Sequence, residues 1–174
     1  MFNILKIRLK EGIKSEDIQV RDENVEILGK KLKEKIDKYF QRSFAIREVD
    51  SGSCNACEYE ISALSNPYYD VERFGIKFVA SPKHADAIMI TGCMTRNMYK
   101  AVLRAYENVP EPKFVIAVGD CVLDGGVFKG SYATMDGIQD KLPVDVWIKG
   151  CPPEPIDIIS GVLKLLEEKF PDKD

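Results

Sequence analysis

The stretch Phe114-Val115-Ile116-Ala117-Val118-Gly119-Asp120-Cys121 decides the fold. Five consecutive apolar residues that end at a glycine are typical of a strand buried on both faces of a parallel sheet. A second run, Ala87–Ile90, has the same character and is followed by a glycine and Cys93. The two runs together predict a parallel α/β sheet.

Three further apolar runs complete the pattern. The predicted strands are 44–49, 75–80, 87–91, 113–118 and 144–148, and the predicted helices are 56–64, 69–74, 94–108 and 154–169. Thr95 is expected to cap the helix at 94–108. Strands that alternate with helices indicate βαβ units. Residues 44–174 are therefore expected to form one doubly wound α/β domain, with helices on both faces of the sheet.

Residues 1–43 are expected to form an N-terminal extension. Apolar and basic residues alternate in 1–10, which predicts a strand, and 13–24 is expected to be a polar loop. Apolar residues then recur at helical spacing, which predicts an amphipathic helix of about four turns: Val25, Leu28, Leu32, Ile36 and Tyr39. This helix either covers its own domain or docks on a partner or near a membrane surface.

Composition narrows the class of protein. The chain has 174 residues, a net charge of −3, 45% hydrophobic and 30% charged residues. These values are typical of a globular domain and disfavour a disordered chain or a nucleic-acid-binding surface. No apolar run approaches the roughly 20 residues that span a bilayer, and no signal peptide is expected. Five cysteines in a chain of cytosolic character favour metal binding or redox chemistry over disulfides.

Each of the five cysteines follows the carboxyl end of a predicted strand. Because these ends lie on one edge of a parallel sheet, where doubly wound folds bind ligands, cysteines far apart in sequence are expected to meet there. Four thiolates at one edge match the ligand set of a [4Fe–4S] cluster. The residues concerned are Cys54, Cys57, Cys93, Cys121 and Cys151.

Other uses of these cysteines stay open at this point. A structural zinc site is one, although such sites usually draw on two local Cys-x-x-Cys pairs and only one is present. A thioredoxin-like site is another, but it needs no distant cysteines. Inert buried cysteine is the third alternative and would account for one or two of the five. A nucleotide-binding flavodoxin-like protein would need a glycine-rich phosphate loop, and 51–55 carries cysteine in its place.

Several motifs resemble one known family. The segment Ser51-Gly52-Ser53-Cys54-Asn55-Ala56-Cys57-Glu58-Tyr59-Glu60-Ile61 resembles the first cluster motif of [NiFe]-hydrogenase small subunits, most of all the membrane-bound, energy-converting group. Asp70–Gly75, Ser81–Asp86, Pro110–Lys113, Gly119–Cys121 and Gly150–Pro155 resemble segments of that group and of the related 20 kDa-type iron–sulfur subunit of respiratory complex I. The resemblance covers about residues 44–168.

The resemblance implies a flavodoxin-like fold without flavin and one [4Fe–4S] cluster. Its ligands would be Cys54, Cys57, Cys121 and Cys151, with the cluster beside the active site of a large subunit. The nickel–iron site would belong to that large subunit. Further partners would be a ferredoxin-like iron–sulfur subunit and integral membrane subunits. The chain would thus be peripheral, on the cytoplasmic side of the membrane, in an oxidoreductase complex of hydrogenase type, and would carry no substrate chemistry itself.

Three features bear on this expectation. Cys93 is surplus to a four-ligand cluster and is expected nearby, with a substitute-ligand role as the alternative. Asp120 stands where many relatives have a small residue, and either lowers the cluster potential or faces water. Cys54 and Cys57 are separated as in hydrogenases, whereas complex I subunits have two adjacent cysteines. The alternative partner is a nickel-free large subunit that reduces a quinone or a sulfur compound.

The remaining candidates are residues around the first motif. Glu58 and Glu60 are expected to serve proton movement, to dock the large subunit or to act as helix N-terminal carboxylates. Arg73 is expected in a structural ion pair. His84 and Trp147 are expected to have no ligand or relay role. Tyr59, Tyr68 and Tyr69 are candidate interface anchors.

Overall fold

The computed structural model describes residues 22–171 and, nearer the N-terminus, residues 6, 7, 9, 10 and 12. Its centre is one five-stranded sheet in the order β2-β1-β3-β4-β5, with all neighbours parallel. This order and the helices on both faces are those of the flavodoxin-like fold, as predicted. The strands are β1 Phe44–Asp50, β2 Ile76–Phe78, β3 Ala87–Thr91, β4 Phe114–Val118 and β5 Val146–Ile148.

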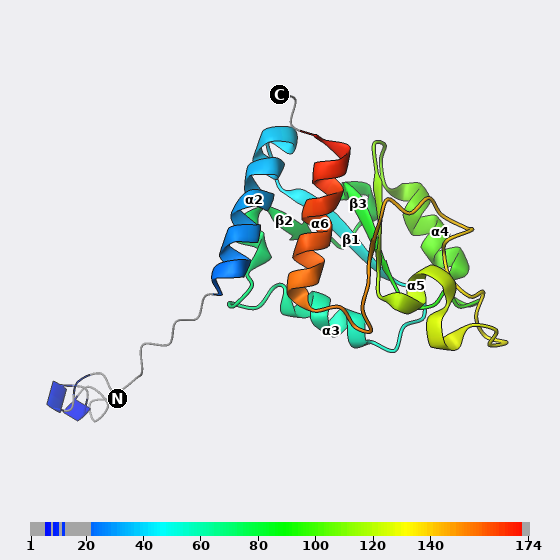
Figure 1. Ribbon diagram of the computed structural model, residues 1–174, viewed down its shortest axis with the longest axis horizontal. Coiled ribbons are helices and arrows are strands. Elements are labelled where there is room, and N and C mark those ends of the chain that lie inside the picture. The colour runs from blue at the N-terminus through cyan, green and yellow to red at the C-terminus, as the bar shows by residue number, and fades with distance from the viewer. Residues whose placement is uncertain (1–5, 8, 11, 13–21, 172–174) are drawn as a thin grey trace.

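Helices cover both faces of the sheet (Figure 1). Helices α2, α3 and α6 pack on one face, and α4 packs on the other. The α-helices are α2 Glu23–Phe40, α3 Ala56–Ala63, α4 Tyr99–Asn108, α5 Asp120–Asp124 and α6 Pro155–Lys169. Short 3₁₀ turns occur at η1 Val71–Phe74, η2 Pro82–His84 and η3 Gly126–Phe128.

The central strands are buried on both sides, and this explains their continuous apolar sequence. In β3, Ala87 and Met89 belong to the core under α2 and α6. Ile88 and Ile90 alternate with them and belong to the core that includes Val102 of α4. Because successive strand residues point to opposite faces, a strand between two helix layers needs apolar residues at every position.

Helix α2 follows the predicted periodicity. Its N-terminus is capped by Asp22, whose carboxylate accepts a hydrogen bond from the Asn24 N–H at 2.8 Å. The apolar stripe is buried in the same core as α6, and its fully buried members include Leu32 and Ile36. Gly29 lies where any side chain would collide with the Phe74 ring, which permits the close approach of α2 and η1. None of the helices in the part of the chain that the structure describes is long and apolar enough to cross a membrane.

The structure corrects three predicted elements. Residues 6, 7, 9 and 10 are helical and exposed, not a strand, and they pair with none of the five strands of the sheet; the rest of 1–10 and most of 13–24 lie outside the described residues. The helix predicted at 94–108 begins only at Tyr99, because Thr95 bonds to Ser51 and forms an isolated bridge with Thr134. The segment predicted as helix 69–74 is the 3₁₀ turn η1.

Candidate metal centre

Four cysteines from three separate loops line one cavity at the carboxyl edge of the sheet. Cys54 and Cys57 come from the loop after β1 and the first turn of α3, Cys121 from the first turn of α5, and Cys151 from the loop after β5. The cavity has a volume of about 240 Å³. Its other walls include Ala56, Val127, Phe128 and Pro152, so its surroundings are largely apolar.

Cys57 is the innermost of the four. It is 6% exposed and belongs to the core under α6, whereas Cys54 and Cys151 are exposed and Cys121 is intermediate. Gly119 makes room for it: a Cβ built there would lie 2.8 Å from the Cys57 Sγ, and its φ of +99° is one that side-chain-bearing residues rarely adopt. A glycine at the end of β4 is therefore a requirement of the cavity.

Two hydrogen bonds join the turns that carry Cys121 and Cys151. The Asp120 N–H donates to the Gly150 carbonyl at 2.9 Å, and the Gly150 N–H donates to the Asp120 carboxylate at 2.9 Å. The Trp147 indole donates to the Gly119 carbonyl at 2.9 Å. Asp120 is exposed at this junction, so its side chain bridges two turns at the surface. Sequence reasoning did not find this link, because neither residue predicts a partner 30 positions away.

Cys93 lies behind the cavity wall and is not among the residues that line it. It is 3% exposed, and its Sγ is 3.5 Å from the Gly52 carbonyl. The surrounding loop is tightly fastened, since the buried Ser51 hydroxyl donates to the Thr91 carbonyl at 2.7 Å. The Asp50 carboxylate accepts from the backbone of Gly52 at 2.6 Å. Cys93 therefore does not line the cavity, but it lies close enough to Cys121 to contribute to the raised pKa of that thiol, so it is nearby, as expected.

The two less exposed thiols of the cavity, those of Cys57 and Cys121, have raised pKa values. Burial, with smaller contributions from nearby negative groups, raises the pKa of Cys57 to about 12 and that of Cys121 to about 11. Redox-active and nucleophilic cysteines have lowered pKa values, so this site does not favour a thioredoxin-like activity. Thiolates in such a cavity require positive charge among them, and a metal centre supplies it.

The spacing of the thiols bears on the kind of metal. Within the described ranges, no three His, Cys, Asp or Glu side chains lie close enough to hold one metal ion. Four thiolates on one tetrahedral zinc stand only about 3.8 Å apart, because each Zn–S bond is about 2.3 Å. A [4Fe–4S] cluster takes its four thiolates at different irons and suits a wider set. The donor set of the cavity therefore fits a cluster better than a single ion.

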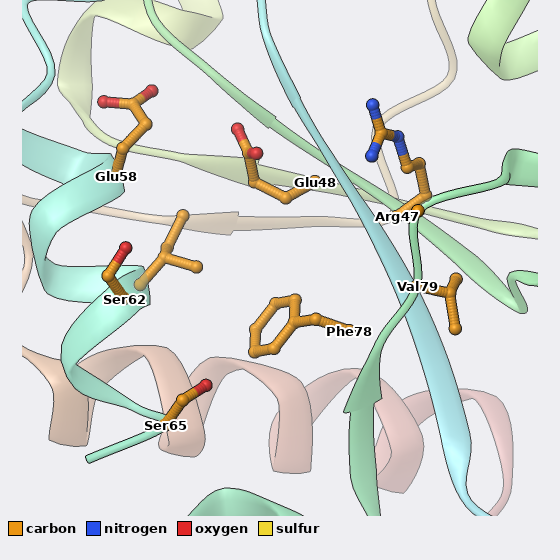
Figure 2. A pocket seen from close by; sticks show the side chains of 9 residues that line it. Arg47, Glu48, Glu58, Ser62, Ser65, Phe78 and Val79 are labelled. Atoms are coloured by element: carbon orange, nitrogen blue, oxygen red, sulfur yellow. The ribbon is translucent and has the colours of Figure 1, made fainter.

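A second pocket, of about 360 Å³, adjoins the first cysteine motif (Figure 2). We call it the acidic pocket; it is lined by Arg47, Glu48, Glu58, Ile61, Ser62, Ser65, Phe78, Val79 and Ala80. Both carboxylate oxygens of Glu58 are buried, without a hydrogen-bond partner among the described residues. Burial and the nearby Glu58 raise the pKa of Glu48. Sequence reasoning singled out Glu58 but not Glu48, whose position on a strand gave no signal of this neighbour.

The other candidates lie outside the cavity. Glu60 is half-buried on α3. Arg73 forms the expected ion pair, with its Nη1 2.5 Å from Glu26 of α2, and its guanidinium stacks on Phe74. His84 is exposed in η2. Tyr59 is 70% exposed, whereas Tyr68 and Tyr69 contact each other edge to face.

Known proteins resemble this chain across the same region. Formate hydrogenlyase subunit 7 of Escherichia coli is 44% identical over 142 residues, which are 80% of this chain and 56% of that protein. The probable membrane-bound hydrogenase subunit mbhJ of Pyrococcus furiosus is 46% identical over 131 residues, 75% of this chain and 78% of that protein. The chain thus spans little more than half the length of the first of these relatives.

Solved structures agree with the fold. A chain of the membrane-bound sulfane sulfur reductase, an archaeal respiratory membrane complex, is 34% identical with a TM-score of 0.66, over 77% of this chain and 75% of that one. A chain of an NAD⁺-reducing [NiFe]-hydrogenase has a TM-score of 0.57 at 19% identity, over 76% of this chain and 96% of that one, and supports the fold alone. The family described as NADH ubiquinone oxidoreductase, 20 Kd subunit, matches residues 54–165, which span the whole cysteine cavity, and this chain belongs to that family.

Proposed function

We propose that this chain is the electron-transfer subunit of a membrane-bound [NiFe]-hydrogenase complex. It holds one [4Fe–4S] cluster through Cys54, Cys57, Cys121 and Cys151, next to the active site of a large catalytic subunit. The observation that carries the proposal is the shared cavity of four cysteines from three loops. Family membership supports it, because named relatives are subunits of hydrogenase and NADH-quinone oxidoreductase complexes.

The chain's own residues shape the environment of the bound group. When bound, a [4Fe–4S] cluster supplies one-electron transfer. Cys57 fastens it to the core, and the bonds between Asp120 and Gly150 hold two other ligands in register. Val127 and Phe128 of η3 line the cavity and give it apolar walls. Burial and the backbone donors around such a site set its reduction potential.

The proposal includes the partners of this subunit and its location in the cell. The proposed neighbours are a hydrogenase-like large subunit, a ferredoxin-like iron–sulfur subunit and integral membrane subunits. In this assembly the chain is peripheral, on the cytoplasmic side of the membrane, and its partners hold it there. The exposed side chains of Tyr59 on α3 and Val127 beside the cavity, 70% and 86% exposed, supply apolar surface for such contacts.

A nickel-free complex is the second candidate. This candidate is supported by the 34% identity to a chain of a sulfane sulfur reductase. The proposed electron-transfer role of this subunit would be the same in such a complex. In that case the large subunit reduces a sulfur compound or a quinone. The two candidates differ in the partner and not in the cysteine cavity.

Metal analysis of the native complex separates the two candidates. The complex is purified anaerobically through a tag on this chain, and its iron and nickel are measured. Abundant iron with about one nickel per copy of the chain supports the hydrogenase. Iron without nickel moves the large subunit to the second candidate. Absence of cluster iron contradicts the electron-transfer role in both.

A further inference from the structure

We infer that the acidic pocket receives a long basic side chain, arginine or lysine, from a neighbouring subunit of the complex. This inference rests on the proposed function, because it requires a partner over the carboxyl edge of the sheet. It deepens that proposal by assigning a contact of defined chemistry next to, but separate from, the cysteine cavity.

The first argument concerns two neighbouring carboxylates that lack strong hydrogen-bond donors within the described part of the chain. Glu58, on the first turn of α3, has two fully buried oxygens without a donor among the described residues. Glu48, on β1, faces the same space, and the one side-chain donor to it in the described part of the chain is the Thr91 hydroxyl, at 3.5 Å. Figure 2 shows the two carboxylates turned in the same direction. A buried carboxylate without a donor is costly, so this arrangement calls for a cation from outside.

The nearest cation of the chain does not fill this role. Arg47 also lines the pocket, and its charge partly opposes the rise in the pKa of Glu48, but its side chain leaves β1 on the other side from that of Glu48. Figure 2 shows its guanidinium beyond the strand from Glu58. It forms no ion pair within 4.0 Å of either glutamate in the described part of the chain. The donor must come from elsewhere.

The shape and lining of the pocket select the class of occupant. One end of the pocket presents acceptors, the two carboxylates together with the Ser62 hydroxyl. A guanidinium or ammonium group carries donors only and matches this set. Ile61 and Phe78 form apolar walls, against which the methylene stem of such a side chain packs.

The position of the pocket identifies the source of the side chain. Glu58 directly follows the cavity-lining Cys57, and the neighbouring Tyr59 is 70% exposed. The acidic pocket thus adjoins the first cysteine motif, and we assign the basic side chain to the subunit proposed to cover that motif. A basic side chain at this place would orient the two subunits through a desolvated ion pair at the edge of the electron-transfer contact.

A cryo-EM structure of the anaerobically purified complex tests the inference directly. We expect an arginine or lysine nitrogen of a neighbouring subunit within about 4 Å of the Glu58 carboxylate. A pocket that holds only water, an apolar side chain, a small-molecule cation or Arg47 of this chain would overturn it. If the complex keeps its partners and iron and still shows such a pocket, the proposed function stands and this inference fails. A chain without partners and without iron would overturn both.

Matched variants measure the contribution of the contact. Glu58→Gln and Glu48→Gln/Glu58→Gln should weaken subunit association at least about tenfold in a salt titration of the complex followed by mass photometry. Glu107→Gln removes the same charge from the exposed surface of α4 and should leave association unchanged. Iron content is read in the same samples. If Glu58→Gln loses iron, the test is repeated with Glu48→Gln alone, because Glu48 lies on β1 and does not line the cysteine cavity. Equal association in all variants would contradict the inference.

Discussion

The two edges of the sheet differ in how far the chain itself completes them. At the amino-terminal edge, Asp86 accepts hydrogen bonds from Arg42 and from the Ala45 N–H, the latter at 2.8 Å. Asp145 repeats between β4 and β5 the arrangement that Asp86 makes between β1 and β3, and it accepts from the Val115 N–H at 2.8 Å. Each of these aspartates immediately precedes a strand and ties it to the second residue of its neighbour. At this edge, the aspartates and the backbone N–H groups satisfy one another by hydrogen bonds within the chain.

The carboxyl edge is left open. Four thiols with no disulfide between them line a cavity there, and both oxygens of Glu58 lack a donor among the described residues. Functional sites often break the rules that the rest of a fold obeys. The amino edge thus contributes to stability, whereas the carboxyl edge holds the groups that we propose bind a cofactor and a partner.

The largest expected effect follows from removing the innermost thiol. Cys57→Ala should abolish cluster binding, because it deletes the ligand that is fastened to the core. Cys93→Ala, a matched loss of a buried thiol, should retain the iron because Cys93 does not line the cavity. Iron and acid-labile sulfide per chain, measured after anaerobic purification, check both. Loss of iron in Cys93→Ala with retention in Cys57→Ala would reverse the ligand assignment.

The next effect concerns the glycine that makes room for Cys57. Gly119→Ala places a Cβ 2.8 Å from the Cys57 Sγ at a φ of +99° and should speed loss of iron to a chelator. We also expect it to lower the free energy of unfolding by about 1–3 kcal/mol. Gly130→Ala is the control, since its φ is +75° but nothing lies within 4 Å of the added Cβ. Equal rates of iron loss in the two variants would mean that backbone strain alone matters.

A smaller effect is expected at the amino-terminal edge. Asp86→Ala leaves the Ala45 N–H without its side-chain acceptor and should lower the free energy of unfolding by about 1–3 kcal/mol. Iron content should not change, because Asp86 is at the opposite edge. Asp37→Ala removes an exposed ion pair with Lys33 and should change stability by less than about 0.5 kcal/mol. Chemical denaturation and iron analysis of both variants check this; an Asp86→Ala chain that loses iron would refute the separation of the two edges.

The smallest effect is a shift of potential. Asp120→Asn removes a negative charge near the cavity and keeps an oxygen that accepts from the Gly150 N–H. Removal of this charge favours the reduced form, so the midpoint potential should rise by on the order of 10–30 mV, a small shift because the side chain is exposed and screened. A redox titration followed by EPR measures it. A fall in potential would contradict the electrostatic argument.

Much of this comparison could be predicted from the sequence. Continuous apolar runs such as Phe114–Val118 identify central strands, and their order fixes the edge at which the following cysteines meet. Local sequence patterns do not predict an element whose bounds depend on a long-range contact. The hydrogen bond from Thr95 to Ser51 keeps Thr95 outside α4, which begins only at Tyr99. Helix α5 has five residues and is too short for a periodic signal. Glu48 and Glu58 come close to each other only when β1 and α3 pack together.

The most direct test of the central claim is the metal and sulfide content of the full chain, produced and purified without oxygen. We expect four iron atoms and four acid-labile sulfides per chain, the composition of one [4Fe–4S] cluster. One zinc without sulfide, or a chain with neither metal, would contradict the assignment of the cysteine cavity.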